Sequence, residues 1–194
     1  VLVRIAERST ILCKRALDIG ADGIMIPWME NVEDVEEAVR DCLYPPEGRR
    51  GIGGERASAW GQCLNEHAAE ANENVLIIPM IESIAAIPNI PSMCKVDGID
   101  MFFFGPADFS STAGFRGQWE GPGVAEQILS LKDTIKAAGK HCGVVSTSNQ
   151  NITDRLDQGF QMLALGTECG LLWLSLHQSL KKIDRDRSLA TSLD

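Results

Sequence analysis

Apolar residues along this chain gather into short runs separated by longer amphipathic stretches. The most pronounced runs are residues 75–81 and 101–104, and continuous apolar runs of this length are typical of strands buried on both faces. Residues 83–96, between them, carry isoleucines at helical spacing together with prolines. This stretch predicts a helix or helical turns that return the chain, so the two strands are expected to be parallel.

The same alternation of strand and helix continues on either side of this unit. Further strands are predicted at residues 1–4, 23–27, 142–145 and 161–166. Helices are predicted at residues 9–20, 31–42, 61–72, 122–138, 151–158 and 168–183, with Ser9 and Asn31 as N-caps and Gly20 as a stop. Six strands separated by helices, without a Rossmann fingerprint, favour a (β/α)8 TIM barrel of the α/β class over a doubly wound sheet.

A typical barrel of this kind has eight strands and about 250 residues, whereas this chain offers six strands in 194 residues. Val1 begins in the middle of an apolar run, while the other end closes with a helix and a polar tail. We therefore expect residues 1–194 to form a single barrel domain that is truncated at its N-terminus and lacks the first two strands.

The charge balance and the cysteines narrow the class of protein. The net charge is −9, from 18 Lys and Arg against 27 Asp and Glu, which argues against nucleic acid or an acidic membrane as a partner. The six cysteines lie far apart without a C-x-x-C pair, as is typical of reduced thiols in an intracellular protein. With no signal peptide or long apolar segment in the sequence, we expect a cytoplasmic protein.

Two carboxylates follow the central strands. Glu82 comes directly after the first strand, and Asp108 ends the sequence Gly-Pro-Ala-Asp after the second. Parallel strands end at the same side of a sheet, here called the carboxyl edge, and chemistry in parallel α/β folds is placed there. Without a nearby Cys or His, the two acids predict an oxygen site for Mg²⁺ or Mn²⁺ rather than for zinc. The alternative is that Glu82 is an acid at a helix N-terminus and Asp108 is an ordinary turn residue.

Arg4 ends the first predicted strand and is expected at the same carboxyl edge. A guanidinium is always charged, and beside a metal-bound carbonyl it can stabilise a developing enolate oxygen. The alternative is an arginine that forms a surface salt bridge. Together with Glu82 and Asp108, Arg4 suggests carbon–carbon cleavage of an oxo acid through a metal-stabilised enolate.

Four motifs occur in one order along the chain: LDIGA at 17–21, YPPxGxRGxG at 44–53, Ile81-Glu82, and GPADxS at 105–110. Together they resemble the HpcH/HpaI aldolase/citrate lyase family, which includes 4-hydroxy-2-oxoheptanedioate and 2-dehydro-3-deoxyglucarate aldolases. The resemblance spans nearly the whole chain. It implies a barrel of the phosphoenolpyruvate/pyruvate type, assembled as a homo-oligomer, commonly a hexamer that exchanges its last helix. It also implies a reversible, metal-dependent cleavage of a 4-hydroxy-2-oxo acid to pyruvate and an aldehyde.

The resemblance also implies the ligands of the metal and of the pyruvate carboxylate. Glu82 and Asp108 match the protein ligands of the divalent ion, which is Mg²⁺ or Mn²⁺, with Co²⁺ as an alternative. Ala107 and Asp108 match positions whose backbone N–H groups hold the carboxylate, and an anion site suits the start of a loop or helix. Gly105 and Pro106 belong to the same substrate-binding segment.

Arg4 and Asp18 match the two further catalytic positions of the family. Arg4 matches the arginine that steadies the keto oxygen, and Asp18 matches an acid that raises the basicity of a catalytic histidine. The position of Asp18 near a helix C-terminus disfavours an anion, so a compensating contact is expected; a solvated acid is the alternative. The catalytic histidine itself is expected on a segment before Val1, because the three histidines of this chain, His67, His141 and His177, do not match it.

Three features leave the substrate and the assembly open. Met80 stands in the substrate site where the family's aldolases often carry Gln, and a thioether cannot replace an amide. A CoA-ester lyase of the citrate or malyl-CoA lyase type, macrophomate synthase and a non-catalytic barrel therefore remain alternatives.

Residues 44–60 are expected to lie over the carboxyl edge, with Arg49, Arg50 and Arg56 free to meet a distal carboxylate of the substrate. The helix at 168–183 is apolar nearly all round, which predicts a subunit interface, with a core helix as the alternative.

Overall fold

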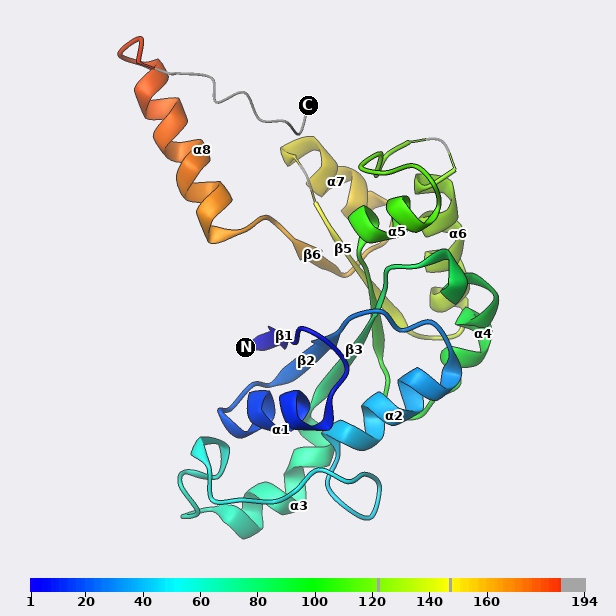
Figure 1. The fold of residues 1–194 in the computed structure, drawn as a ribbon, viewed down its shortest axis with the longest axis vertical. Coiled ribbons are helices and arrows are strands. Elements are labelled where there is room, and N and C mark those ends of the chain that lie inside the picture. Colours follow the sequence, from blue (N-terminus) through cyan, green and yellow to red (C-terminus); the bar gives the residue numbers. More distant parts are fainter. Residues whose placement is uncertain (122, 147, 186–194) are drawn as a thin grey trace.

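The computed structural model describes residues 1–121, 123–146 and 148–185. Six parallel strands form one sheet in sequential order, and the sheet curves through the middle of the molecule (Figure 1). The strands are β1 (Leu2–Arg4), β2 (Gly23–Ile26), β3 (Leu76–Ile81), β4 (Met101–Phe104), β5 (His141–Val145) and β6 (Met162–Ala164). All six predicted strands are confirmed to within two residues at either end, and the architecture is a parallel half-barrel.

Helices join the strands, and all but the last of those described lie along the outer face or the ends of the sheet (Figure 1). They are α1 (Thr10–Asp18), α2 (Val32–Cys42), α3 (Leu64–Asn74), α4 (Ile90–Met93), α5 (Pro106–Thr112), α6 (Ala125–Ala137), α7 (Asn149–Asp157) and α8 (Glu168–Lys181), with 3-10 turns η1 (Arg56–Ser58) and η2 (Ile84–Asn89). The sequence did not predict α5 or η1. The predicted helix start at Pro122 and the tail from residue 186 lie outside the described residues.

Local capping explains where the first two helices begin and end. The Ser9 hydroxyl accepts a hydrogen bond from the backbone N–H of Leu12, and the Asn31 side chain accepts one from Asp34. Gly20 adopts φ +92° just after α1, a conformation that glycine reaches without steric cost. The predicted caps and stop are therefore confirmed.

Side chains of β3 alternate between the two faces of the sheet, which explains its unbroken apolar sequence. Ile77 and Ile81 join the core between the sheet and the outer helices, whereas Ile78 and Met80 join Phe103 on the inner face. All residues of β3 after Leu76 are buried. The prediction that this strand is buried on both faces is confirmed.

The connection from β3 to β4 is helical but broken. The Ser83 hydroxyl caps η2 by accepting a hydrogen bond from the Ala85 N–H. The short helix α4 follows η2 directly, so the two do not form one continuous α-helix. Pro88 and Pro91 lack the N–H donors that a continuous helix requires at those positions. The predicted helical turns over this stretch are thus confirmed, and they return the chain so that β4 pairs in parallel with β3.

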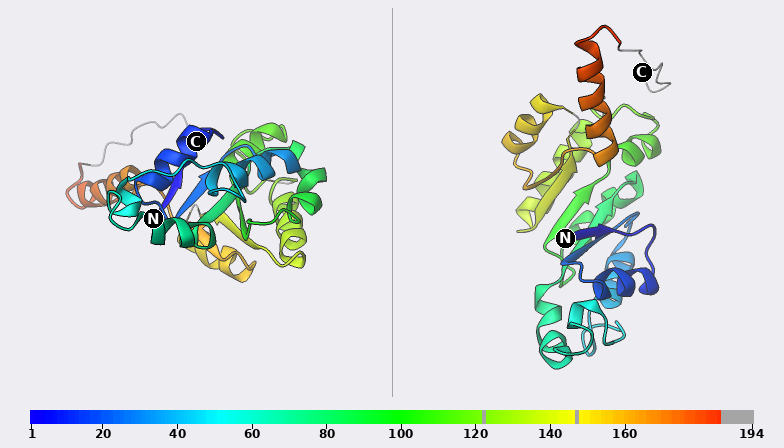
Figure 2. Two further views of the ribbon diagram at one scale, coloured as in Figure 1. Left: turned by 90° about the horizontal axis from the view of Figure 1, so that it is seen from below. Right: turned by 90° about the vertical axis from the view of Figure 1, so that its left-hand side faces the viewer.

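The last helix, α8, stands away from the rest of the molecule (Figures 1 and 2). None of its residues is buried, and its exposed apolar side chains are Leu171, Leu172, Trp173, Leu174 and Leu176. The alternative of an ordinary core helix is therefore wrong for this chain, while the subunit interface stays a prediction. None of the helices in the described part of the chain is long and apolar enough to span a bilayer.

Candidate active site at the carboxyl edge

Strands β1, β3 and β4 place the three predicted groups at the carboxyl edge. Arg4 is the last residue of β1, Glu82 follows the last residue of β3, and Asp108 lies in the first turn of α5 after β4. The strands are parallel, so all three residues lie where strands end. The charges of Arg4 and Asp108 both act on the Glu82 carboxyl. The structure therefore brings the three groups together, as predicted.

Glu82 is a buried acid held mainly by the backbone. Its residue is only 3% exposed, and its Oε2 accepts a hydrogen bond of 3.0 Å from the backbone N–H of Trp28. Burial raises the pKa of the Glu82 carboxyl, the Trp28 N–H and the charge of Arg4 lower it, and the charge of Asp108 raises it. A cation placed beside a buried carboxylate of this kind stabilises its ionised form.

Gly105 lies against the Glu82 side chain. A Cβ at this position would lie 2.7 Å from Glu82 Oε1 and 2.8 Å from its Cγ, closer than real atoms approach. The Gly105 N–H donates to the Ile81 carbonyl at 3.1 Å. The glycine of the GPAD motif therefore allows the loop after β4 to approach the acid after β3.

The first turn of α5 presents backbone N–H groups beside Glu82. Pro106 begins the helix, and Phe109 makes the first intrahelical bond, to the Gly105 carbonyl. The N–H groups of Ala107 and Asp108 precede that bond, so they have no acceptor within the helix. Ser110 Oγ donates to the Ala107 carbonyl at 2.7 Å and fixes this turn. Ala107 and Asp108 are exposed, so this edge can meet a small anion.

The chemistry of the two acids fits a hard divalent ion. Glu82 and Asp108 offer carboxylate oxygens, the ligands that Mg²⁺ and Mn²⁺ prefer. In the residues that the structure describes, no group of three or more His, Cys, Asp or Glu side chains could hold a metal ion. Two carboxylates alone would leave the other positions of an octahedral ion to water and substrate.

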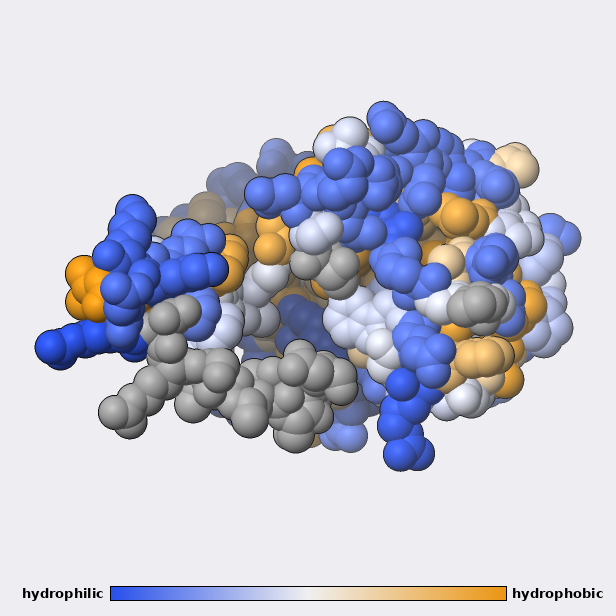
Figure 3. Space-filling view, turned by 90° about the horizontal axis from the view of Figure 1, so that it is seen from above, coloured by the Kyte–Doolittle hydropathy of each residue, from blue (hydrophilic) through white to orange (hydrophobic). Residues whose placement is uncertain are grey.

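Met80 lies on the inner face of the sheet, two residues before Glu82. Its side chain is buried with Ile78 and Phe103, and its carbonyl accepts a hydrogen bond of 3.1 Å from the Met29 N–H. The thioether fills space beneath the carboxyl edge and brings no polar donor to it. Seen from above, the middle of the molecule is hollowed, with hydrophilic residues inside the hollow (Figure 3).

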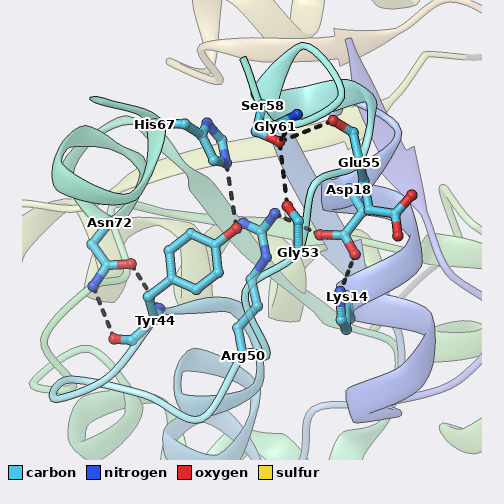
Figure 4. Close-up of polar contacts among 10 residues, drawn as sticks. All are labelled: Lys14, Asp18, Tyr44, Arg50, Gly53, Glu55, Ser58, Gly61, His67 and Asn72. Atoms are coloured by element: carbon cyan, nitrogen blue, oxygen red, sulfur yellow. Dashed lines mark hydrogen bonds and ion pairs between the residues drawn. The ribbon is translucent and has the colours of Figure 1, made fainter. Parts of the chain in front are cut away.

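Asp18 lies at the opposite side of the sheet, here called the amino edge. It is the last residue of α1, close to where β2 begins. Its carboxylate accepts from Lys14 and, at 3.0 Å, from Arg50 Nη2 (Figure 4). Its side chain is 13% exposed. The predicted compensating contact is confirmed and the solvated acid is excluded, and both of these partners lie on the same side of the sheet as Asp18.

The arginines of the loop 44–60 are each paired with groups of the same chain, and the prediction that they are free is wrong. Arg50 is 3% exposed, and its guanidinium lies over the Tyr44 ring at 4.4 Å. Arg49 pairs with Glu37 and Asp41. Arg56 donates to a backbone carbonyl.

The physical reason for this correction is topological. The loop 44–60 connects α2 to the segment before β3, and a loop from a helix to the next strand of a parallel sheet reaches the amino edge. The predicted position over the carboxyl edge is therefore also wrong.

The three histidines are engaged away from the carboxyl edge. His67 Nε2 lies 3.4 Å from the Tyr44 hydroxyl, and burial, then the charge of Arg50, lower the pKa of His67. His141 begins β5 and pairs with Gln161, while His177 stacks on Trp173 of the same helix. These positions agree with the expectation that none of the three takes the place of the catalytic histidine.

Trp28 is the residue at this edge that the sequence reasoning missed. It supplies the N–H that binds Glu82, and it adopts φ +58° although it is not glycine. Its signal in the sequence is its position directly after a predicted strand. A backbone conformation of this kind depends on distant contacts, so periodicity does not reveal it.

The sequence of this chain is similar to those of known proteins. Residues 1–173 match the family model described as HpcH/HpaI aldolase/citrate lyase. A 4-hydroxy-2-oxovalerate aldolase of Rhodococcus jostii is 35% identical over 170 residues, which cover 88% of this chain and 66% of that protein. A 2-keto-3-deoxy-L-rhamnonate aldolase of Salmonella gallinarum is 33% identical over 193 residues, covering 98% and 72%. The chain spans about two thirds of the length of the curated relatives that it matches.

Solved structures agree with this grouping. An HpcH/HpaI aldolase/citrate lyase family protein from Burkholderia cenocepacia superposes with a TM-score of 0.90 at 28% identity, covering 94% of this chain and 73% of that one. An HpcH/HpaI aldolase from Desulfitobacterium hafniense superposes with a TM-score of 0.86 at 31% identity, covering 98% and 74%. These likenesses confirm the predicted fold class and the resemblance read from the motifs.

Proposed function

The chain belongs to the HpcH/HpaI aldolase/citrate lyase family, and on that premise we propose that it is a carbon–carbon lyase of the metal-dependent aldolase type. It reversibly cleaves a 4-hydroxy-2-oxo acid to pyruvate and an aldehyde. The observation that carries this proposal is the buried Glu82 carboxyl at the carboxyl edge, with the charges of Arg4 and Asp108 acting on it.

Glu82 and Asp108 are the residues that would hold the ion, whether Mg²⁺, Mn²⁺ or Co²⁺. A divalent ion bound there supplies a Lewis acid that polarises a carbonyl. The raised pKa of Glu82 supports this assignment, because the ionised form gains from a neighbouring positive charge.

Arg4 and the start of α5 orient the oxo acid. The N–H groups of Ala107 and Asp108, with Gly105 and Pro106 shaping the turn, bind the carboxylate of the pyruvate half. Arg4 donates to the keto oxygen, on which negative charge grows as the carbon–carbon bond breaks. A preorganised donor aimed at such an oxygen is a common source of rate acceleration.

The roles proposed for Met80 and Asp18 have different support. Met80 lines the inner face beneath Glu82, so it can only shape the substrate site. Asp18 is bound by Lys14 and Arg50 at the amino edge, so its catalytic role stays a prediction from the resemblance alone.

The CoA-ester lyase alternative has less support than the aldolase. A CoA ester requires cations for its phosphates, and the arginines of the loop 44–60, Arg49, Arg50 and Arg56, are already paired at the amino edge. The curated relatives described above are named as aldolases. We therefore favour the aldolase over the lyase and over a non-catalytic barrel.

We further propose a cytoplasmic homo-oligomer, a hexamer by resemblance, built from chains in which residues 1–194 belong to one barrel domain. The exposed apolar side chains of α8 support association between copies, since a free surface of this kind is unusual on a monomer. Small oxo acids, rather than nucleic acid or membranes, are the proposed partners of a chain with a net charge of −9.

Metal titration combined with pyruvate release tests the proposed function, with the full-length protein that carries the catalytic histidine expected before Val1. The metal-stripped protein should release no pyruvate from a 4-hydroxy-2-oxo acid, and adding Mg²⁺, Mn²⁺ or Co²⁺ should restore the release. A citrate-type CoA ester serves as the competing substrate. Pyruvate release that ignores chelation, or cleavage of the CoA ester alone, would contradict the proposal.

A further inference from the structure

Trp28 combines a strained backbone with an exposed indole at the carboxyl edge. Its φ of +58° lies in the left-handed region, which aromatic side chains rarely adopt. Its residue is nevertheless 46% exposed, so burial of the indole does not explain why this conformation is kept. Strain that the fold maintains at a surface position is a reason to look for a function.

Contacts of Trp28 and of the two residues after it hold the loop after β2 in place. Its own N–H donates to Glu82 Oε2 at 3.0 Å, and the next N–H, from Met29, donates to the Met80 carbonyl at 3.1 Å. The Glu30 carbonyl accepts from Asn89 at 2.8 Å. Three consecutive residues thus fasten this loop to β3 and to η2, and the position of Trp28 is fixed by its surroundings.

The loop after β2 also holds Glu82, one of the two proposed metal ligands. Glu82 Oε2 meets the Trp28 N–H, while the side chain packs against Gly105 on the loop after β4. The carboxylate is therefore held between two loops before any ion is bound. Trp28 acts here through its main chain, so this part of its role would survive replacement of the indole.

The indole belongs to a residue that is 46% exposed, so part of it is open to a ligand. It offers a flat apolar face with a single N–H, on a loop that touches the carboxylate proposed to bind the ion. The pyruvate half of the substrate is proposed to occupy the start of α5 and the side of Arg4. The group left for Trp28 is then the other half, the aldehyde.

We propose that Trp28 is a positioning and specificity residue: its N–H orients Glu82, and its indole forms the wall against which an aldehyde with an apolar chain packs. This inference rests on the proposed aldolase function and deepens it by naming the substrate class. It predicts a preference for aliphatic aldehydes over glyoxylate, whose carboxylate gains nothing from an apolar wall.

Trp60 provides a matched control within the same chain. It is also a tryptophan with positive φ, +54°, and it is 72% exposed. It lies on the loop 44–60 at the amino edge, just after η1. The two residues therefore share side chain and backbone conformation and differ in their place relative to the carboxyl edge.

The first measurement locates the indole. Mn²⁺ or Co²⁺ added to the metal-free protein should quench part of the tryptophan fluorescence, since paramagnetic ions quench nearby indoles. Trp28→Phe should remove most of that ion-dependent quenching, whereas Trp60→Phe should leave it intact. Quenching that is unchanged in Trp28→Phe would overturn the inference.

The second measurement tests selectivity in the direction of aldol addition to pyruvate, with variants of the full-length protein that carries the expected histidine. Trp28→Ala should lower the ratio of kcat/KM for butanal to kcat/KM for glyoxylate by about tenfold, the scale expected for lost apolar contact. Trp60→Ala should leave the ratio unchanged. Trp28→Gly accepts positive φ without strain, so it gives the same test should Trp28→Ala fold poorly.

These outcomes separate the two claims. A wild-type protein that binds the ion but neither cleaves oxo acids nor adds aldehydes to pyruvate would refute the proposed function, and the aldehyde role of Trp28 with it. An active wild-type enzyme whose aldehyde ratio is unchanged in both Trp28 variants would refute only the inference about Trp28.

Discussion

Each edge of the sheet carries an acid close to an arginine, but the two acids are held in different ways. At the amino edge, Asp18 is neutralised directly by Lys14 and Arg50. At the carboxyl edge, Glu82 is more deeply buried, its hydrogen bond comes from a backbone N–H, and a second acid acts on it. An acid and an arginine together therefore do not mark a reactive site. A buried acid whose charge the fold leaves without a direct cationic partner is the better marker.

The largest expected effect comes from removing the charge of the acid at the carboxyl edge. Glu82→Gln should abolish metal-dependent pyruvate release, a loss of about a thousandfold or more. Because burial raises the pKa of Glu82, its ionised form is costly to the fold, and the variant should be at least as stable as the wild type. Steady-state kinetics and thermal unfolding measure both effects. A stable variant with normal metal-dependent turnover would remove Glu82 from the site.

Arg4→Ala should have the next largest effect. Losing one preorganised donor to a developing oxyanion costs about 10²- to 10³-fold in rate. Exchange of the pyruvate methyl protons, which requires the same enolate but no aldehyde, should fall together with cleavage. Affinity for the ion should change little. Near-normal proton exchange in the variant would reduce Arg4 to a surface salt-bridge residue.

Arg50→Met tests whether the ion pair at the amino edge contributes to stability rather than to metal binding. It leaves Asp18 partly buried with one of its two cationic partners, and removing one member of a buried pair costs about 3 kcal/mol. The melting temperature should therefore fall by about 6–12 °C. Mn²⁺ binding by the folded variant should stay as in the wild type. Loss of ion binding at a temperature where the variant is folded would mean that the two edges are coupled.

Gly105→Ala tests the close approach of two loops at the carboxyl edge. The added Cβ would meet Glu82 Oε1 at 2.7 Å, so the carboxylate must move, and we expect an affinity for Mn²⁺ lower by about tenfold. Gly53→Ala is the matched control at the amino edge, because its nearest atom would lie at an ordinary 3.7 Å. Equal affinities in the two variants would show that the position of Glu82 tolerates displacement.

The smallest effect is a pH dependence at the amino edge. Burial, then the charge of Arg50, lower the pKa of His67 below its unfolded value of about 6.5. The unfolded state then binds a proton that the folded state does not, so the free energy of unfolding falls as pH falls from about 6.5 to the folded pKa. Urea titrations across this range should show the fall in the wild type and less of it in His67→Gln. An identical pH dependence in both proteins would contradict this assignment.

Strand positions and caps were predictable because they are local properties of the sequence. The apolar run of β3 and the caps at Ser9 and Asn31 appear in the structure as predicted. Parallel pairing then placed Arg4 and Glu82 at one edge without any knowledge of distances. These inferences need only periodicity, hydrogen-bonding side chains and the rule that parallel strands end together.

Two parts of the candidate site could not be predicted in the same way. The arginine-rich loop was assigned to the wrong edge because its charge suggested a substrate, whereas its connection from a helix to a strand decides where it lies. The role of the Trp28 N–H depends on a positive φ and on a residue 54 positions away. Neither the strain nor the partner leaves a mark on hydrophobic periodicity.

Direct binding of Mn²⁺ tests the central claim, which is that Glu82 and Asp108 hold one divalent ion. The metal-free protein is titrated with Mn²⁺, and the free ion is counted by its electron paramagnetic resonance signal. We predict a single site in the wild type, an affinity at least about a hundredfold lower in Glu82→Gln and in Asp108→Asn, and wild-type affinity in Arg50→Met. Wild-type affinity in both carboxylate variants would contradict the account.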